Sequence, residues 1–276
     1  MGGRIGSVPV LRVGFVGLGD QGAPMARRIV DEGFPLTVWA RRAASLAPFE
    51  GTPAATARDL AELGRRSDLV GICVVDDDDV RSVVAAPDGV LGGMSPGGLI
   101  VVHSTVHPRT CHEIAALARD GGVAVVDAPV SGGGLAAAAR KLLVLVGGAD
   151  ADIERALPVL RTFGDPVVPV GPLGSGELVK LVNNALMTAQ LGLADDALRL
   201  ASVLGLDPSR VAGAVLQASG ASFSLGVRSR MPAGLEGFVA HRLLRKDLDI
   251  LASVVDAAGS GLGALGDAAE SALGRM

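Results

Sequence analysis

The sequence contains no tyrosine, and this absence excludes one large class of oxidoreductases. Its 276 residues include two cysteines and four histidines but no Tyr. Dehydrogenases that use a tyrosine–lysine pair as the proton donor are therefore ruled out. Zinc-dependent alcohol dehydrogenases are disfavoured as well, because they need a full set of catalytic metal ligands and often a second, structural metal site.

The chain also lacks the features of a secreted, membrane-spanning or nucleic-acid-binding protein. No run reaches the ~18 apolar residues of a transmembrane helix, and the first residues lack the apolar core of a signal peptide. Cys73 and Cys111 suggest no disulfide framework, which is consistent with a reducing compartment. The net charge of −4 argues against a nucleic-acid partner. We therefore expect a cytoplasmic protein with neither a membrane nor a nucleic acid as its partner.

The first 40 residues predict a strand, a glycine-rich turn, a helix and a second strand. The strands are expected at residues 11–16 and 36–40, and the helix at residues 23–32, with Pro24 in its first turn. The turn reads Gly17-Leu18-Gly19-Asp20-Gln21-Gly22. These glycines permit a tight turn and let the backbone approach a pyrophosphate at the helix N-terminus. The unit predicts dinucleotide binding; the alternative is an ordinary turn in a chain with 39 glycines.

The residues at the end of the second strand indicate which dinucleotide is bound. An NAD site usually places Asp or Glu about 20 residues beyond the glycines, to hold the ribose hydroxyls. Here Ala40 takes that place, followed by Arg41 and Arg42. A small neutral residue and two guanidinium groups suit the 2′-phosphate of NADP, because arginine binds phosphate bidentately. We expect NADP rather than NAD, with a solvated basic turn as the alternative.

Apolar segments alternate with helical ones as far as residue 170. Further strands are predicted at residues 69–75, 99–102, 123–127, 142–146 and 167–170, and further helices at residues 57–66, 80–86, 111–120 and 153–163. This alternation predicts an α/β fold with a doubly wound, mainly parallel Rossmann-type sheet. Beyond the Gly/Pro-rich stretch 171–176 only helices are expected, at residues 177–204, 208–217, 243–258 and 265–273. We therefore predict a dinucleotide-binding domain (residues 1–172) and an all-α domain (residues 173–276).

Polar segments follow several of the predicted strands, and ligands of such sheets bind beyond the carboxyl ends of the strands. Val74 and Val75 are the last residues of one predicted strand, and Thr105 follows another, with a hydroxyl able to reach a nicotinamide or its ribose. Residues 127–134 offer a serine hydroxyl and bare backbone N–H groups, which suit a carboxylate; a flexible glycine turn is the alternative. The four acids at residues 76–79 match no calcium loop and predict a solvated loop with helix caps.

A metal site is the least supported interpretation of the polar residues. His103, His107 and His112 lie close in sequence, but Pro108 prevents them from sharing one helix face. We therefore expect no bound metal.

The long helix predicted at residues 177–204 carries one unusual polar pair. Lys180 and Asn184 are four residues apart, so both side chains leave the same face of an otherwise apolar helix. They are candidates for the chemistry of the protein; a snorkelling surface lysine is the alternative. At ~40 Å, the helix is long enough to join two domains or two subunits.

Five blocks match a known family in order. They are Gly17-Leu-Gly-Asp-Gln-Gly-Ala-Pro-Met25, Ser104-Thr105, Asp127-Ala-Pro-Val-Ser-Gly-Gly133, Gly176-Glu-Leu-Val-Lys-Leu-Val-Asn-Asn184 and Lys246-Asp-Leu248. The chain resembles the β-hydroxyacid dehydrogenases, which include 3-hydroxyisobutyrate dehydrogenase, tartronate semialdehyde reductase, and glyoxylate and succinic semialdehyde reductases. The resemblance implies that Lys180 is the catalytic acid/base and that Arg41 marks an NADP user. It assigns substrate binding to Ser131, Gly132, Gly133 and Asn184, and further cofactor contacts to Val74, Val75, Thr105 and Lys246.

The implied function is hydride transfer between NADP(H) and a small β-hydroxyacid or its semialdehyde, in a homodimer or higher homo-oligomer. Two alternatives remain. Imine reductases share the architecture but typically carry Asp or Tyr in place of Lys180, and a non-catalytic dinucleotide-binding protein would be expected to lack this lysine. The chain departs from the family where Gly-Thr-Leu becomes Arg140-Lys141-Leu142, where Val102 replaces an acid, and where it ends soon after Leu273. These departures leave the substrate and the subunit packing open.

Overall fold

The computed structural model describes residues 10–231 and 234–276, which form two compact units. The first unit ends at Lys180, and the second runs from Leu181 to Met276. Each unit has apolar cores of its own.

The first unit is built on a nine-stranded sheet within the described residues. The strands are β1 (Val13–Val16), β2 (Leu36–Trp39), β3 (Ala55–Thr56), β4 (Leu69–Ile72), β5 (Leu99–Val102), β6 (Ala124–Asp127), β7 (Val130–Ser131), β8 (Leu142–Gly147) and β9 (Gly164–Gly171). Their order is β3-β2-β1-β4-β5-β6-β8-β7, with β9 beside β8. Strands β1 to β6 are parallel, whereas β8 runs antiparallel to β6 and β7. The predicted doubly wound, mainly parallel sheet is confirmed.

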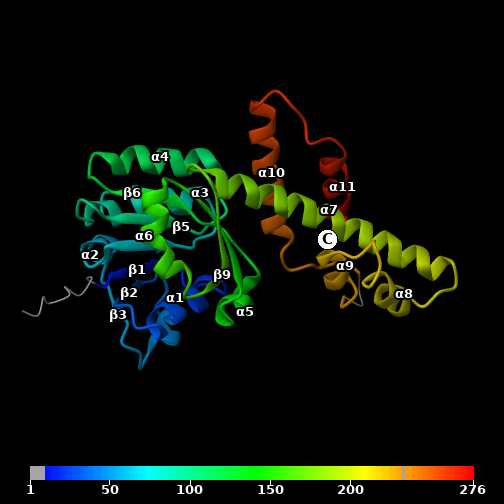
Figure 1. Cartoon of the computed structure of the whole chain (residues 1–276), viewed down its shortest axis with the longest axis horizontal. Helices are drawn as coiled ribbons and strands as arrows, with labels where there is room; N and C mark the ends of the chain where they lie inside the picture. Colours follow the sequence, from blue (N-terminus) through cyan, green and yellow to red (C-terminus); the bar gives the residue numbers. More distant parts are fainter. Residues whose placement is uncertain (1–9, 232–233) are drawn as a thin grey trace, which may run out of the picture. The chain divides into compact units, whose positions relative to one another are not determined.

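The central strands form because they are short apolar runs that are buried on both faces. All four residues of β1, β4 and β5 are buried. Their side chains alternate between two cores, so that Phe15 enters one core and the next residue, Val16, enters the other. Helices α1 (Gly22–Asp31) and α6 (Asp150–Leu160) contribute to the first core. Helices α2 (Leu60–Arg65), α3 (Asp77–Ala85) and α4 (Pro108–Arg119) contribute to the second, and Figure 1 shows these layers around the sheet.

Sequence signals also explain where several helices begin. The side chains of Asp59 and Asp76 accept backbone N–H groups at the starts of α2 and α3, and Pro108 occupies the first turn of α4. Of the acidic run 76–79, which was predicted to be a solvated loop with helix caps, Asp76 forms the cap and the other three acids form the first turn of α3. Two 3₁₀ helices, η1 (Ala43–Phe49) and η2 (Val90–Gly92), complete the connections.

The second unit is helical throughout its described residues. Helix α7 (Ser175–Val203) begins in the first unit and continues in the second, and α8 (Pro208–Val215), α9 (Phe223–Arg228), α10 (His241–Ala257) and α11 (Gly263–Leu273) follow it. Leu181, Leu191, Leu244, Leu248 and Leu251 form the centre of its main core. Among the described helices, none is long and apolar enough to cross a membrane.

Three features of the fold differ from the sequence prediction. The segment 127–134, for which no strand or helix was predicted beyond residue 127, forms β7 and then the start of α5 (Gly133–Ala138), because Gly132 adopts φ +131° and turns the chain between them. Strand β8 enters the sheet antiparallel to β6. Helix α9 was not predicted, since its six residues are too few to show a helical period.

Candidate active site

The glycine turn after β1 has no room for side chains at two of its three glycines. Gly17 adopts φ +95°, and a Cβ there would overlap the backbone carbonyl of Cys73. A Cβ on Gly22 would overlap the carbonyl oxygen of Gly17 itself. At Gly19, by contrast, a Cβ would meet no atom within 4 Å. The close packing of the turn therefore requires glycine at residues 17 and 22, whereas Gly19 leaves open space beside the backbone.

The start of α1 can hold a phosphate group. No acidic residue lies in its first turn, and no side chain caps it. The side-chain Nε2 of Gln21 is buried and has no hydrogen-bond partner among the described residues. The side chain of Leu18 packs into the apolar core and fixes the turn to it. The side chain of Asp20 is exposed. Unpaired donors at a helix N-terminus favour an anion, and they fit the pyrophosphate of a dinucleotide.

The chain beyond β2 presents the arginine pair to solvent. Ala40 is partly buried, and both Arg41 and Arg42 are exposed. The Arg41 side chain is 81 % exposed, and its guanidinium lies 3.7 Å from the carboxylate of Asp79 in the first turn of α3. An exposed ion pair of this kind is worth at most about 1 kcal/mol, so a phosphate could displace it.

The ends of β4 and β5 are joined by Ser104, which belongs to one of the family blocks but was given no role in the sequence analysis. The backbone N–H of Val74 donates to Oγ of Ser104 at 2.8 Å. Val75 is 60 % exposed, and Thr105 is partly buried. The two valines and Thr105 thus lie at the carboxyl ends of neighbouring strands, where the sequence placed them.

His103 is a core residue. Its ring lies 5.9 Å from that of Phe15 and 5.5 Å from that of Phe163, and Nδ1 lies 2.9 Å from the carbonyl oxygen of Ala128. The Nδ1 nitrogen must carry the proton, because a carbonyl oxygen only accepts. Within the described residues no group of three His, Cys, Asp or Glu side chains could hold a metal.

The serine–glycine segment lies against the glycine turn. Ser131 ends β7 and is partly buried, and Gly132 and Gly133 both have positive φ. At the next residue, Gly134, a Cβ would overlap the carbonyl oxygen of Asp20. Two segments that are more than 100 residues apart in the sequence are thereby brought side by side within the first unit.

Two buried acids fix the start of α7. The carboxylate of Asp127, at the end of β6, accepts the backbone N–H of Gly174 at 2.7 Å and that of Glu177 at 2.8 Å. Glu177 in turn accepts the backbone N–H of Val106, beyond β5, at 3.1 Å. Burial raises the pKa of Asp127, and its hydrogen bonds from backbone N–H groups oppose the shift. The first turn of α7, and with it the buried Lys180, is therefore held at the ends of β5 and β6.

In the second unit, one buried carboxylate joins two of the predicted residues. Nδ2 of Asn184 donates to Oδ2 of Asp247 at 2.6 Å, and Nζ of Lys246 lies 2.9 Å from Oδ1 of the same residue. Asp247 lies on α10 and is 4 % exposed. This contact fixes which way the Asn184 amide is turned, so Asp247 orients a residue of the candidate site.

Two family models and several known proteins match this chain. Residues 12–171 match the family model of the NAD binding domain of 6-phosphogluconate dehydrogenase. Residues 174–273 match that of the NAD-binding domain of NADP-dependent 3-hydroxyisobutyrate dehydrogenase. An NAD-dependent L-serine dehydrogenase from Pseudomonas aeruginosa is 30 % identical over 90 % of this chain and 87 % of its own. The chain belongs to the β-hydroxyacid dehydrogenase family.

Two further relatives come from Mycobacterium tuberculosis. An uncharacterized oxidoreductase is 39 % identical over 71 % of this chain, and the match spans 66 % of that relative's own length. The solved structure of a 3-hydroxyisobutyrate dehydrogenase with L-serine has a TM-score of 0.84 and 27 % identity. It covers 95 % of this chain and 92 % of its own. Members of this family are NAD(P)-dependent hydroxyacid dehydrogenases.

One departure from the family pattern has a structural explanation. Arg140 adopts φ +59°, and its guanidinium pairs with Glu32 at the end of α1. Lys141 is exposed. The Arg140 side chain is therefore engaged at the end of α1, where it holds the end of α5 to that helix.

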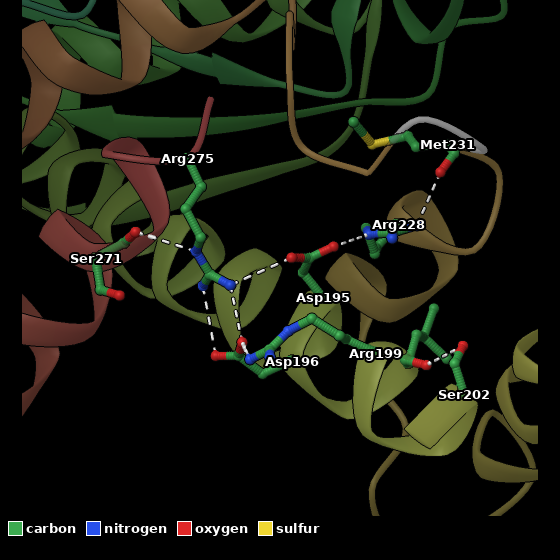
Figure 2. A network of polar contacts seen from close by, with 9 residues as sticks. Asp195, Asp196, Arg199, Ser202, Arg228, Met231, Ser271 and Arg275 are labelled. Atoms are coloured by element: carbon green, nitrogen blue, oxygen red, sulfur yellow. Dashed lines mark hydrogen bonds and ion pairs between the residues drawn. The ribbon is translucent and has the colours of Figure 1, made fainter. Parts of the chain in front are cut away.

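A cavity of about 590 Å³ in the second unit is a separate feature, and none of the predicted site residues lines it. Arg228 and Arg275 lie on its wall and pair with Asp195 of α7 at 2.6 and 3.2 Å (Figure 2). Both arginines are thus paired with a carboxylate. These ion pairs connect α9 and the chain after α11 to α7.

The buried His103 predicts how stability depends on pH. Burial lowers its pKa to about 4, against 6.5 for an ordinary histidine, although the bond to Ala128 raises it. The unfolded chain therefore takes up this proton near pH 6.5 and the folded chain only near pH 4. Its stabilising contribution is complete above pH 6.5 and is lost as the pH falls from 6.5 to 4, by on the order of 3 kcal/mol.

His103→Asn keeps an N–H donor for Ala128 but removes the titration. We expect its free energy of unfolding, measured by urea denaturation from pH 7.5 to 4.5, to fall less steeply than that of the wild type. The exposed His112→Asn is the control and should follow the wild-type curve. Equal slopes for His103→Asn and the wild type would contradict the assignment.

Proposed function

We propose that this protein is an NADP-dependent β-hydroxyacid dehydrogenase/reductase. It transfers a hydride between NADP(H) and a small β-hydroxyacid or its semialdehyde, with Lys180 as general acid/base. The observation that carries the proposal is the anchored start of α7, where Asp127 and Glu177 hold a buried lysine at the ends of two parallel strands. Ligands of such sheets bind at these strand ends.

The dinucleotide is expected to lie along the glycine turn. Its phosphates would face the backbone beside Gly19 and the Nε2 of Gln21, which is an unpaired buried donor. Gly17, Leu18, Asp20 and Gly22 shape the turn, and Val74, Val75, Thr105 and Lys246 are proposed as further contacts. The nicotinamide ring, when bound, supplies or accepts the hydride.

The substrate carboxylate is proposed to bind the serine–glycine segment. The Ser131 hydroxyl and the backbone N–H groups of Gly132 and Gly133 are donors in a turn with positive φ, which suits an anion. Asn184 is proposed as a further substrate contact. Two relatives support this substrate class by their printed descriptions, the L-serine dehydrogenase and the 3-hydroxyisobutyrate dehydrogenase with L-serine, since each names a small hydroxy carboxylate.

Lys180 would move the proton that accompanies the hydride. In reduction its Nζ donates a proton to the carbonyl oxygen as the carbon gains the hydride, and in oxidation it takes the proton from the hydroxyl. The ammonium also stabilises the oxyanion that develops during the transfer. The buried, helical position limits the rotamers of Lys180 and so favours one geometry for this step.

The proposed function is tested by following NADPH consumption with a panel of semialdehydes, glyoxylate and cyclic imines. We expect turnover with semialdehydes or glyoxylate. Turnover of cyclic imines alone would support an imine reductase instead. Cofactor binding without turnover of any panel member would support a non-catalytic dinucleotide-binding protein.

The choice of NADP predicts the effect of Arg41→Ala. We expect KM for NADPH to rise about 10- to 100-fold, because the guanidinium binds the 2′-phosphate, and KM for NADH to change less than about two-fold. Arg58→Ala is the matched control, since its side chain is 82 % exposed and also pairs with an acid, Glu62. It should change neither constant. Equal effects of Arg41→Ala on the two cofactors would refute the NADP assignment.

We further propose a separate role for each of the two parts of the chain, and a cytoplasmic location for the protein. Residues 1–172 would bind the dinucleotide, and residues 173–276 would complete the substrate site and carry subunit contacts. The absence of a disulfide pattern supports a cytoplasmic protein.

A further inference from the structure

The acidic first turn of α3 contacts the arginine that is proposed to bind the 2′-phosphate of NADP. Oδ1 of Asp79, in this turn, lies 3.7 Å from Nη1 of Arg41, which follows β2. A phosphate monoester carries about −1.5 to −2 charges at neutral pH and binds a guanidinium in the way that a carboxylate does. Asp79 and a 2′-phosphate therefore compete for the same cation.

Asp79 differs from the other acids of the run 76–79 in the partner of its side chain. The other three bind groups of α3 and α4: Asp76 accepts the backbone N–H of Asp79 at 2.9 Å, Asp77 accepts the hydroxyl of Thr110 at 2.5 Å, and Asp78 pairs with Arg81 at 3.1 Å. Asp79 instead pairs with the chain that follows β2. This one carboxylate thus places the negative charge of the run beside Arg41.

The two members of this ion pair are held to different degrees. The side chain of Asp79 is 28 % exposed and lies on a helical turn that Asp76 caps, whereas the side chain of Arg41 is 81 % exposed. Their separation of 3.7 Å is that of an ion pair and exceeds that of a hydrogen bond. A phosphate can therefore draw the guanidinium away, but the carboxylate stays in place and then repels the phosphate.

A cofactor without the 2′-phosphate meets a different situation. NAD(H) brings no anion to Arg41, so the guanidinium keeps its ion pair with Asp79. The cation is then already neutralised, and the ribose hydroxyls do not have to replace a lost partner. Asp79 thus opposes the binding of NADP(H) and leaves that of NAD(H) almost unchanged. Both parts of the first effect need Arg41, because this residue brings the phosphate next to the carboxylate.

We propose that Asp79 is a specificity-determining residue that acts through Arg41, weakens the binding of NADP(H) and so lets the enzyme use NAD(H) as well. The inference rests on the proposed function, which places the 2′-phosphate on Arg41. An exposed ion pair and a screened repulsion between surface charges are weak, so we expect Asp79 to raise Kd for NADPH about 3- to 10-fold. The ratio of the two cofactor affinities is then set by this pair.

Asp79→Asn tests the proposal through equilibrium binding, measured by fluorescence titration with NADPH and with NADH. We expect Kd for NADPH to fall about 3- to 10-fold and Kd for NADH to change less than about two-fold, because only NADPH takes Arg41 from its partner. Asp78→Asn is the matched control. It removes the same charge from the same turn, but Asp78 pairs with Arg81, so both constants should stay within about two-fold of the wild type. An unchanged Kd for NADPH, or an equal fall for both cofactors, would overturn the proposal.

A double-mutant cycle tests whether Asp79 acts through Arg41. In an Arg41→Ala background the competition is gone, so adding Asp79→Asn should change Kd for NADPH by less than about two-fold. The same gain in both backgrounds would show that the carboxylate acts on the cofactor without Arg41, and would overturn this part of the proposal.

Two fragments of the cofactors separate this inference from the proposed function. Adenosine 2′,5′-bisphosphate should bind Asp79→Asn about 3- to 10-fold more tightly than the wild type, whereas AMP should bind both equally. Neither fragment carries a nicotinamide, so this result does not depend on Lys180. If the wild type binds neither NADPH nor NADH, the proposed function and the inference both fail. If it oxidises NADPH with a semialdehyde but Asp79→Asn leaves the binding of both fragments unchanged, the inference alone fails.

Discussion

Replacing Lys180 with alanine is expected to lower kcat by about 10²- to 10⁴-fold, the contribution of a positioned general acid/base. The KM for NADPH should change little, because the proton moves only in the chemical step. The side chain is buried at the start of a helix that two buried acids fix in place. The measurement is steady-state turnover of the best substrate from the panel, with NADPH fluorescence as a separate check of cofactor binding.

Three controls separate a lost proton donor from a disturbed fold. Lys180→Met keeps the buried alkyl chain and should be as inactive as Lys180→Ala. Small primary amines should restore part of the Lys180→Ala rate, because they supply the missing donor in the space left by the side chain. Lys141→Ala removes an exposed lysine and should keep wild-type activity. Wild-type turnover by Lys180→Ala would remove this lysine from the mechanism.

The parallel part of the fold could be predicted because its strands are continuous apolar runs. Strand β5 begins and ends at the predicted residues, 99 and 102, and α7 begins two residues before its prediction and ends one residue before it. Burial on both faces makes such strands visible in a single sequence. The starts of α3 and α4 were each predicted three residues too late, at residues 80 and 111, because the polar cap residue Asp76 and Pro108 in the first turn lie outside the apolar period that was used to place the helices.

The residues that hold the candidate site together were less visible. Asp127 bonds residues 47 and 50 positions away, and Asp247 bonds a residue 63 positions away. No local spacing reveals such contacts, although an acid that ends an apolar strand is unusual enough to be a signal. The same limit applies to Gly134, whose need for glycine comes from the carbonyl of Asp20 in a distant turn. Local pattern and the family blocks thus indicated candidate residues, and only the fold indicated what positions them.

The glycine turn provides the second large expected effect, a contrast between two alanine substitutions. Gly17→Ala should destabilise the protein without cofactor by about 3 kcal/mol or more, because its methyl group overlaps the Cys73 carbonyl and its φ is +95°. Gly33 also has a positive φ, but a Cβ there would meet no atom within 4 Å. Gly33→Ala therefore measures the backbone strain alone, and we expect it to lower the free energy of unfolding by about 1 kcal/mol. Urea denaturation gives both values.

Gly19→Ala should behave in the opposite way. Its methyl group meets no protein atom within 4 Å, so stability without cofactor should stay within about 0.5 kcal/mol of the wild type. NADPH affinity, measured by fluorescence titration, should nevertheless fall at least ~10-fold, because the open space beside Gly19 is where the phosphates must approach the backbone. An unchanged affinity would mean that the turn binds no dinucleotide. A loss of stability as large as that of Gly17→Ala would mean that the space beside Gly19 is filled by the protein itself.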